Sequence, residues 1–217
     1  MCFSASASFG AGLVLSIAGI VTLRIAKKRS VVIFAFIPIL FAVQQITEGF
    51  VWVCLSTPSW EPWQDIPIAI FLFLSHVLWP VWIPLSIWLL EKPGWRKKIL
   101  FTLLCLGILL AIYHFYFIVT YTPKAEILSC HIDYITSFPE SLMLLSAMLY
   151  GLTTIIPTLI SSSKRMWMMG VVLTIAYVVS KLFYEAYLVS VFCFFAALMS
   201  IVVYLILRKN FLHLHTS

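Results

Sequence analysis

Positive charge is confined to a few short segments of this chain, and this pattern constrains the fold more than any other feature. Of the 14 Lys and Arg residues, 12 fall in the segments 24–29, 92–98, 164–165 and 208–209. Long apolar stretches separate these segments, and a helix needs about 20 apolar residues to cross a bilayer core of roughly 30 Å. Basic residues are retained on the cytoplasmic side of membrane proteins. The pattern therefore predicts a helical membrane protein whose basic loops lie in the cytoplasm.

The apolar stretches predict an all-α, integral membrane bundle of seven transmembrane helices. This bundle forms a single domain over residues 1–217, with the N-terminus outside, the C-terminus cytoplasmic and no soluble domain. The predicted location is the cytoplasmic membrane of the cell. The longest loop, 122–138, is expected outside. The spans are expected at about residues 9–23, 31–55, 67–90, 99–121, 139–160, 166–187 and 190–207.

Composition supports this fold class and argues against nucleic-acid binding. The chain is 63% hydrophobic and 10% charged, whereas soluble domains carry about 25% charged residues. The net charge is +6, but the basic residues sit at loop ends, where orientation and anionic lipid headgroups account for them. No basic stripe with interleaved aromatic residues is present in the sequence. The expected partner is therefore the lipid bilayer, with no nucleic acid.

A few ionisable residues fall inside the expected spans. Such residues are costly in lipid and usually face a wet cavity or the interior of a bundle. At about 1.5 Å of rise per residue, Glu48 and His114 are expected roughly 10 Å below the outer surface and His76 roughly 14 Å below it. Lys181 and Glu185 fall in the outer third of the sixth span. This shared depth predicts one polar pocket that opens towards the outside.

Glu48 is the expected centre of this pocket. Gln44, Glu48 and Trp52 are four residues apart and so share one helix face, and Gln45 lies close beside Glu48. A carboxyl group in a membrane needs a proton, a cation or a metal to be tolerated. The leading hypothesis is therefore an outward-facing site that binds a small ligand, a proton or a cation at Glu48, with the two glutamines orienting the carboxylate.

The remaining ionisable residues keep simpler alternatives open. His76, Lys181 and Glu185 complete the wall of the expected pocket, but Lys181 and Glu185 are four residues apart and can also neutralise each other within one helix. His76 can equally be a buried imidazole that bonds to a neighbouring group, and His114, in the aromatic run 113–117, can equally be a residue of the membrane interface. A third functional class, a sensor or assembly subunit with a structural pocket, also stays open.

The cysteines and histidines supply a second hypothesis of a different class. Cys2, Cys54, Cys130 and Cys193 all fall near the outer face, where they could form two disulfides. Alternatively, Cys2 could serve as a thiolate ligand in a site for zinc or another transition metal. Such a metal would activate water in a membrane-embedded hydrolase acting on a lipid or small amphiphile. The candidate ligands are Cys2, Glu48, His76, His114 and His131.

Prolines inside the expected spans indicate where helices are kinked. Pro38, Pro80, Pro84 and Pro157 each fall within an apolar stretch. Proline bends a helix and can expose backbone carbonyl groups to a cavity. The segment 79–82, which contains Pro80, follows His76 by about one turn; packing alone accounts for it, and shaping the wall of the pocket is the alternative.

Several short strings together resemble an uncharacterised family of small bacterial multi-pass membrane proteins. They are Met1-Cys2-Phe3-Ser4-Ala5, Gln44-Gln45 with Glu48-Gly49 and Trp52, Trp79-Pro80 with Pro84, Glu91 before a basic loop, and the segment 190–197. The resemblance extends over nearly the whole chain. It implies a membrane location and a fold of this size, and it carries no assigned activity.

Overall fold

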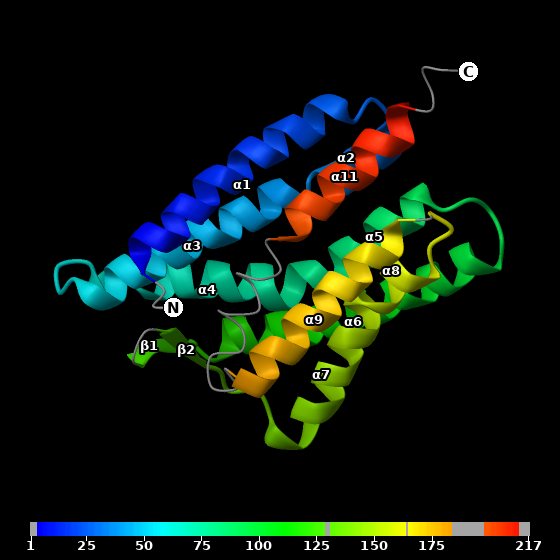
Figure 1. The fold of residues 1–217 in the computed structure, drawn as a ribbon. Helices are drawn as coiled ribbons and strands as arrows, with labels where there is room; N and C mark the ends of the chain where they lie inside the picture. Colours follow the sequence, from blue (N-terminus) through cyan, green and yellow to red (C-terminus); the bar gives the residue numbers. More distant parts are fainter. Residues whose placement is uncertain (1–3, 129–130, 164, 184–197, 213–217) are drawn as a thin grey trace.

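The chain is predominantly helical in the computed structural model, which describes residues 4–128, 131–163, 165–183 and 198–212 (Figure 1). One β-hairpin interrupts the series of helices. In chain order the helices are α1 (Ala5–Ile25), α2 (Arg29–Ala35), α3 (Ile37–Ser56), the 3₁₀ turn η1 (Glu61–Trp63), α4 (Asp65–Leu72), the π-helical turn η2 (Phe73–Leu78), α5 (Trp79–Leu90), α6 (Trp95–Thr120), α7 (Glu140–Thr154), α8 (Ile156–Ile160), α9 (Met166–Phe183) and α11 (Met199–Leu212). The hairpin strands β1 (Lys124–Leu128) and β2 (His131–Ile135) lie between α6 and α7.

Five helical segments of the described chain are long and apolar enough to cross a membrane. They are Ala5–Ile25, Arg29–Ser56, Glu61–Leu90, Trp95–Thr120 and Glu140–Ile160. Two shorter apolar helices follow, Met166–Ser180 and Met199–Arg208. The prediction of a helical chain with several membrane-spanning segments is therefore confirmed. Parts of the expected spans 166–187 and 190–207 fall outside the described residues.

Three of the four prolines predicted to kink helices follow a break or a wide turn, whereas Pro84 lies inside α5 without a break. The segment α2–α3 breaks at Phe36, two residues before Pro38, and α7–α8 breaks at Ile155, two residues before Pro157. In α4–α5 the wide turn η2 ends two residues before Pro80. Proline lacks an N–H and its ring clashes with the preceding turn, so each of these helices changes direction or winding before its proline.

Small residues let α1 lie close along α3 (Figure 1). A Cβ atom added to Gly12 would lie 2.6 Å from Ile46, and one added to Gly19 would lie 2.3 Å from Ile39. Close backbone approach through small residues is the usual way in which membrane helices associate. Near the end of α1, Thr22 adds a hydrogen bond to α2, because its hydroxyl donates to the carbonyl of Ala35 at 3.0 Å.

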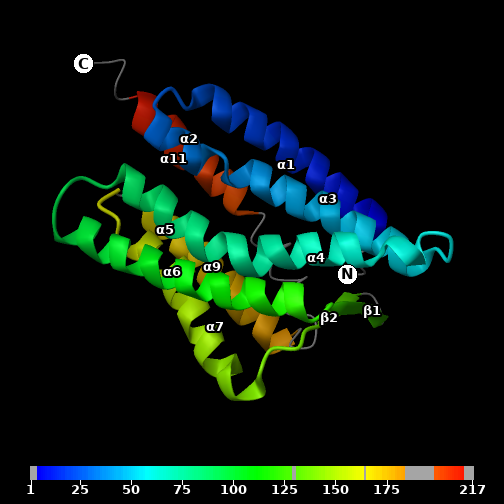
Figure 2. The ribbon, with the colours of Figure 1, turned by 180° about the vertical axis from the view of Figure 1, so that it is seen from behind.

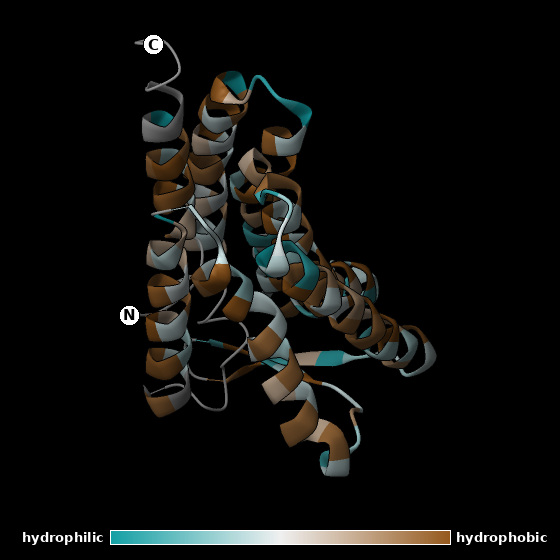
Figure 3. Cartoon of the chain, turned by 90° about the vertical axis from the view of Figure 1, so that its right-hand side faces the viewer, coloured by the Kyte–Doolittle hydropathy of each residue, from teal (hydrophilic) through white to brown (hydrophobic). Residues whose placement is uncertain are grey.

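The two ends of the bundle differ in character (Figures 1 and 2). The hairpin and the α3–η1 turn lie at one end, here called the hairpin end. The α1–α2, α5–α6 and α8–α9 loops and the end of α11 lie at the other. Basic residues from all four segments of positive charge fall there, so we call it the basic end. Hydrophobic residues dominate the helix shafts between the two ends (Figure 3).

The hairpin lies within residues 122–138, for which the sequence predicts a loop. Its strands are antiparallel, with Glu126 opposite Asp133 and Ala125 opposite Tyr134. Ile132 is fully buried, and the ring of Tyr134 stacks on Phe71 of α4 at 4.6 Å. The apolar face of the hairpin thus packs onto the helices at this end of the bundle.

Several helices leave large apolar side chains exposed. Leu144 of α7 is 71% exposed, Leu13 of α1 65% and Leu109 of α6 64%. Apolar surface of this extent marks a contact with lipid or another protein. Together with the lengths of the helices, it is what a membrane-embedded protein requires.

Candidate functional site

Glu48 lies in the buried middle of α3, beside two glutamine side chains. It is 2% exposed, and Gln44 and Gln45 are also buried. The Nε2 group of Gln45 donates to Oε2 of Glu48 at 3.2 Å. The indole N–H of Trp79 donates to Oε1 of Gln44 at 2.7 Å, which ties α3 to α5. The Gln45 amide is therefore oriented with its N–H towards Glu48.

Two buried polar atoms near Glu48 lack a hydrogen-bond partner among the described residues. They are Oε1 of Gln45 and Nε1 of Trp52, which lies one turn after Glu48 on the same face. The Trp52 ring belongs to an apolar cluster that includes Ala125 and Ile132 of the hairpin. Trp52 thus packs against the hairpin, while the unpartnered Oε1 atom belongs to Gln45, which is hydrogen-bonded to Glu48. Buried polar groups in native proteins nearly always have partners, so these two atoms mark a place for an additional polar group.

A second polar cluster surrounds the π-helical turn η2. Pro80 has no N–H, so it can serve neither the carbonyl of His76, four residues back, nor that of Ser75, five residues back. Side chains from other helices bond both carbonyls. The Tyr150 hydroxyl of α7 donates to the Ser75 carbonyl at 2.6 Å, and Nδ1 of His114 on α6 lies 3.0 Å from the His76 carbonyl.

Both ring nitrogens of His114 have hydrogen-bond partners. Because a carbonyl oxygen only accepts, Nδ1 carries the proton that bonds the His76 carbonyl. In the neutral ring, Nε2 is then an acceptor, and it lies 2.7 Å from the hydroxyl of Ser146 on α7. His114 is 2% exposed, and Ser146 is partly buried. The ring is therefore fixed in one tautomer, and the Ser146 hydroxyl donates to it.

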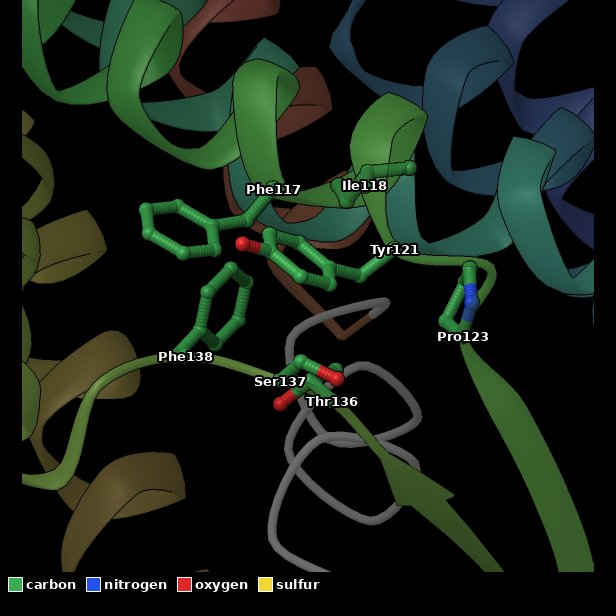
Figure 4. Close-up of a pocket in the computed structure, with 7 residues that line it drawn as sticks. All are labelled: Phe117, Ile118, Tyr121, Pro123, Thr136, Ser137 and Phe138. Carbon is green, nitrogen blue, oxygen red and sulfur yellow. The ribbon is translucent and has the colours of Figure 1, made fainter.

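Aromatic rings enclose this second cluster. The rings of His76 and His114 are 5.4 Å apart, and the Phe138 ring lies 5.0 Å from His114 and 5.6 Å from His76. Phe138 also borders a shallow hollow beside the hairpin, in which the side chains leave no enclosed room for a water molecule. Figure 4 shows the rings of Phe117, Tyr121 and Phe138 gathered around this hollow, which Thr136 and Ser137 close from the hairpin side.

The hairpin carries ionisable groups with perturbed protonation. Burial raises the pKa of Asp133, and the charge of Glu126, directly opposite on β1, raises it further. Burial also lowers the pKa of His131, which is 9% exposed. Both shifts in pKa favour the neutral form of the group.

Glu91 anchors the opposite, basic end. Its carboxylate accepts hydrogen bonds from the backbone N–H of Ser162 at 2.9 Å and from the hydroxyl of Ser161 at 3.2 Å. Burial acts to raise the pKa of Glu91, but these hydrogen bonds and the nearby charge of Arg96 outweigh it and lower the pKa. Glu91 therefore joins the end of α5 to the α8–α9 loop and has a structural role.

The structure places the predicted site residues in separate groups. Glu48 and Gln45 are in contact, and so are His76 and His114, while His131 lies on the hairpin. Cys2, Cys130, Cys193, Glu185 and the side chain of Lys181 lie outside the described residues. Cys54 is a buried free thiol, so the predicted pair of disulfides using all four outer cysteines is not formed here.

The zinc hypothesis stays a prediction. Among the residues that the structure describes, no three His, Cys, Asp or Glu side chains are grouped so that they could hold a metal ion. His114 already uses both nitrogens in hydrogen bonds. Ser146 and Tyr150 are not predicted as site residues, because a serine and a tyrosine in an apolar helix form no distinctive pattern. The one signal in the sequence is Pro80, which leaves the carbonyls of Ser75 and His76 without their helical N–H donor and so implies donors on neighbouring helices.

Comparison with known proteins identifies the family of the chain and nothing further. The chain matches a family of unknown function, DUF6629, over residues 1–215, and it belongs to that family. The expectation of an uncharacterised family is thereby confirmed. No curated protein and no solved structure matches the chain.

Proposed function

We propose that this protein is a multi-pass membrane protein that binds a proton or a small cation at Glu48, in a polar pocket reached from outside the cell. The observation that carries the proposal is the arrangement around the buried carboxyl group. Gln45 donates its N–H to Glu48, so its Oε1 atom becomes a second acceptor close by, and this atom has no partner among the described residues.

The chemistry of these atoms favours a positively charged or protonated occupant. A carboxylate and an amide oxygen are the ligands that hard cations prefer. A carboxyl group that is 2% exposed in an apolar bundle is stabilised by taking up a proton or by a neighbouring positive charge. The buried indole N–H of Trp52, one turn away, adds a donor that could orient a bound water or a polar ligand.

The proposed topology places this pocket on the outer side. We infer seven spans, with the hairpin end outside and the basic end in the cytoplasm, because basic residues are retained on the cytoplasmic side. In the sequence, no Asp, Glu, Lys, Arg or His falls in the half of any expected span nearer the basic end. A polar path to the cytoplasm is therefore not supplied by charged side chains, which favours a one-sided binding site over a transport pathway.

Infrared difference spectroscopy of the purified protein tests this proposal with protons and Na⁺ as the probes. Spectra of the wild type in lipid, recorded while pH or Na⁺ concentration is varied, are expected to show a carboxyl or carboxylate band change that Glu48→Gln removes. Glu140→Gln is the matched control, because Glu140 is exposed at the start of α7, and it is expected to keep the change. Folding of each variant is checked by helical circular dichroism. A folded Glu48→Gln variant whose difference spectra equal those of the wild type in both titrations refutes the proposal.

A further inference from the structure

The contact between Ser146 and His114 has the geometry of a nucleophile and its general base. The hydroxyl oxygen of Ser146 lies 2.7 Å from Nε2 of His114. A catalytic pair of this kind needs a serine and a histidine within about 2.6–3.2 Å, with a third group that orients the histidine. Here the third group is the backbone carbonyl of His76, 3.0 Å from Nδ1 of His114.

The orienting carbonyl is available because of a sequence feature. Since Pro80 cannot donate to the carbonyl of His76, that oxygen is released from the helix and faces α6. It requires a proton on Nδ1 of His114, which leaves Nε2 basic and turned to Ser146. This is the role that a buried carboxylate plays in serine hydrolases, where it holds the imidazole in the correct tautomer.

A second bond fixes the rotation of α7. Tyr150 lies one turn after Ser146, so both side chains leave the same face of the helix. The Tyr150 hydroxyl donates to the Ser75 carbonyl, the other oxygen released by Pro80. Tyr150 is thus a positioning residue, because its hydrogen bond holds the face of α7 that carries Ser146 towards His114.

The surroundings of Ser146 indicate which substrates can reach it. Ser146 is partly buried, and neighbours on α7 are exposed apolar residues, with Met143 56% exposed and Leu145 53%. An apolar molecule in the membrane can therefore approach Ser146 along α7 without passing through water. Phe138, whose ring lies 5.0 Å from that of His114, also lines the shallow hollow of Figure 4 beside the hairpin.

From this geometry we propose that Ser146 and His114 hydrolyse a carboxylic ester carried by a lipid or another membrane-dissolved molecule. The inference goes beyond cation binding at Glu48 and uses none of its residues. Ser146 Oγ attacks the ester carbonyl carbon while its proton passes to Nε2 of His114. The bond to the alkoxy group then breaks, the departing alcohol takes that proton, and an acyl-Ser146 ester remains. Water then attacks this ester with His114 again accepting the proton, and the free acid and Ser146 are regenerated.

Covalent labelling of the full-length protein in detergent or lipid tests the proposal directly. The probe is a fluorophosphonate with a long alkyl chain, which phosphonylates activated serines, and the labelled residue is identified by mass spectrometry of its peptides. The wild type is expected to take up one label per chain, at Ser146. Hydrolysis of a medium-chain p-nitrophenyl ester is expected from the same preparation and is expected to stop once labelling is complete.

Three variants separate catalysis from structure. Ser146→Ala is expected to lose the label, and Ser141→Ala, an exposed serine on the same helix, is expected to label like the wild type. His114→Asn can keep a donor to the His76 carbonyl but has no basic nitrogen, so labelling is expected to slow by about 100-fold or more. Because the wild type alone gives the first result, misfolding of a variant cannot hide it. Folded wild type with no label on Ser146, or folded His114→Asn that labels at the wild-type rate, overturns the proposal.

Discussion

Replacing Gly107 with alanine should separate α6 from α5 and disrupt the His114 site. Gly107 is buried on α6, and any larger residue there would clash with α5, because an added Cβ would be 1.9 Å from the carbonyl oxygen of Pro80. That oxygen is itself released from its helix, since the residue that would bond it four positions later is Pro84, which has no N–H. α6 can therefore approach α5 closely because of Pro80, Pro84 and Gly107.

The size of the effect follows from the distances. Real Cβ contacts essentially never fall below 3.0 Å, so the gap must widen by at least about 1.1 Å. His114 lies two turns after Gly107, and the same shift would stretch its 3.0 Å bond to the His76 carbonyl to roughly 4 Å, beyond hydrogen-bonding range. Overpacking costs about 1–3 kcal/mol and a buried unsatisfied group a further 1–3 kcal/mol, against about 1 kcal/mol gained from the helix propensity of alanine. We therefore expect a net loss of roughly 1–5 kcal/mol in the free energy of unfolding.

Gly151→Ala on α7 is the matched control. A Cβ atom there meets nothing within 4 Å, so this variant should be as stable as the wild type or more stable by up to about 1 kcal/mol. Both free energies can be measured by reversible SDS-induced unfolding in mixed micelles, followed by tryptophan fluorescence. Equal stability of the two alanine variants would refute the argument that Gly107 fixes the spacing of α5 and α6.

Three further predictions rest on single contacts. Hydrogen bonds hold the pKa of Glu91 below its ordinary value of 4.5. The stability that the ionised Glu91 contributes is therefore complete above about pH 4.5 and is lost as pH falls through the pKa of the folded state. Unfolding midpoints measured against pH should show this loss of stability in the wild type and not in Glu91→Gln. Thr22→Val removes the hydrogen bond to Ala35 and should lower the free energy of unfolding by about 1 kcal/mol, whereas Thr22→Ser should not; equal values for the two variants would contradict the assignment. Tyr150→Phe should slow fluorophosphonate labelling of Ser146 in protein that is still folded, and an unchanged labelling rate would remove Tyr150 from its positioning role.

Hydropathy and proline positions predicted much of the helical framework. Every described helix from α1 to α8 lies largely within an expected apolar span or, for η1, in its flanking loop, and the break before Pro38 follows from the missing N–H of that residue. The sequence does not predict the hairpin, because its strands, 124–128 and 131–135, are only five residues long. Their signal was present in the alternation of Ile132 and Tyr134 with polar neighbours, but it is weak over five residues.

The candidate sites were predictable only in part. Helical spacing placed Gln45 against Glu48 correctly, because both lie on one helix and the helix repeat fixes their relation. Similar depth for His76 and His114 agreed with their contact, yet depth alone cannot say which helices are neighbours. Ser146 contacts His114 because α7 packs on α6. The two residues are 32 positions apart in the chain, and no local sequence pattern predicts their contact.

The wide turn η2 before Pro80 also interrupts the alignment of the peptide dipoles in its membrane helix. An unbroken helix cancels its peptide dipoles internally and shows its negative pole only at the last carbonyls. Here the carbonyls of Ser75 and His76 are turned out of the helix partway along it, so a local negative pole faces α6 and α7 within the bundle. A positive charge that forms for a moment on His114, as when its ring holds the proton of Ser146, would lie against that pole. The interruption of the helix before Pro80 would thus stabilise a positive charge on His114 with backbone carbonyls alone, without a buried carboxylate.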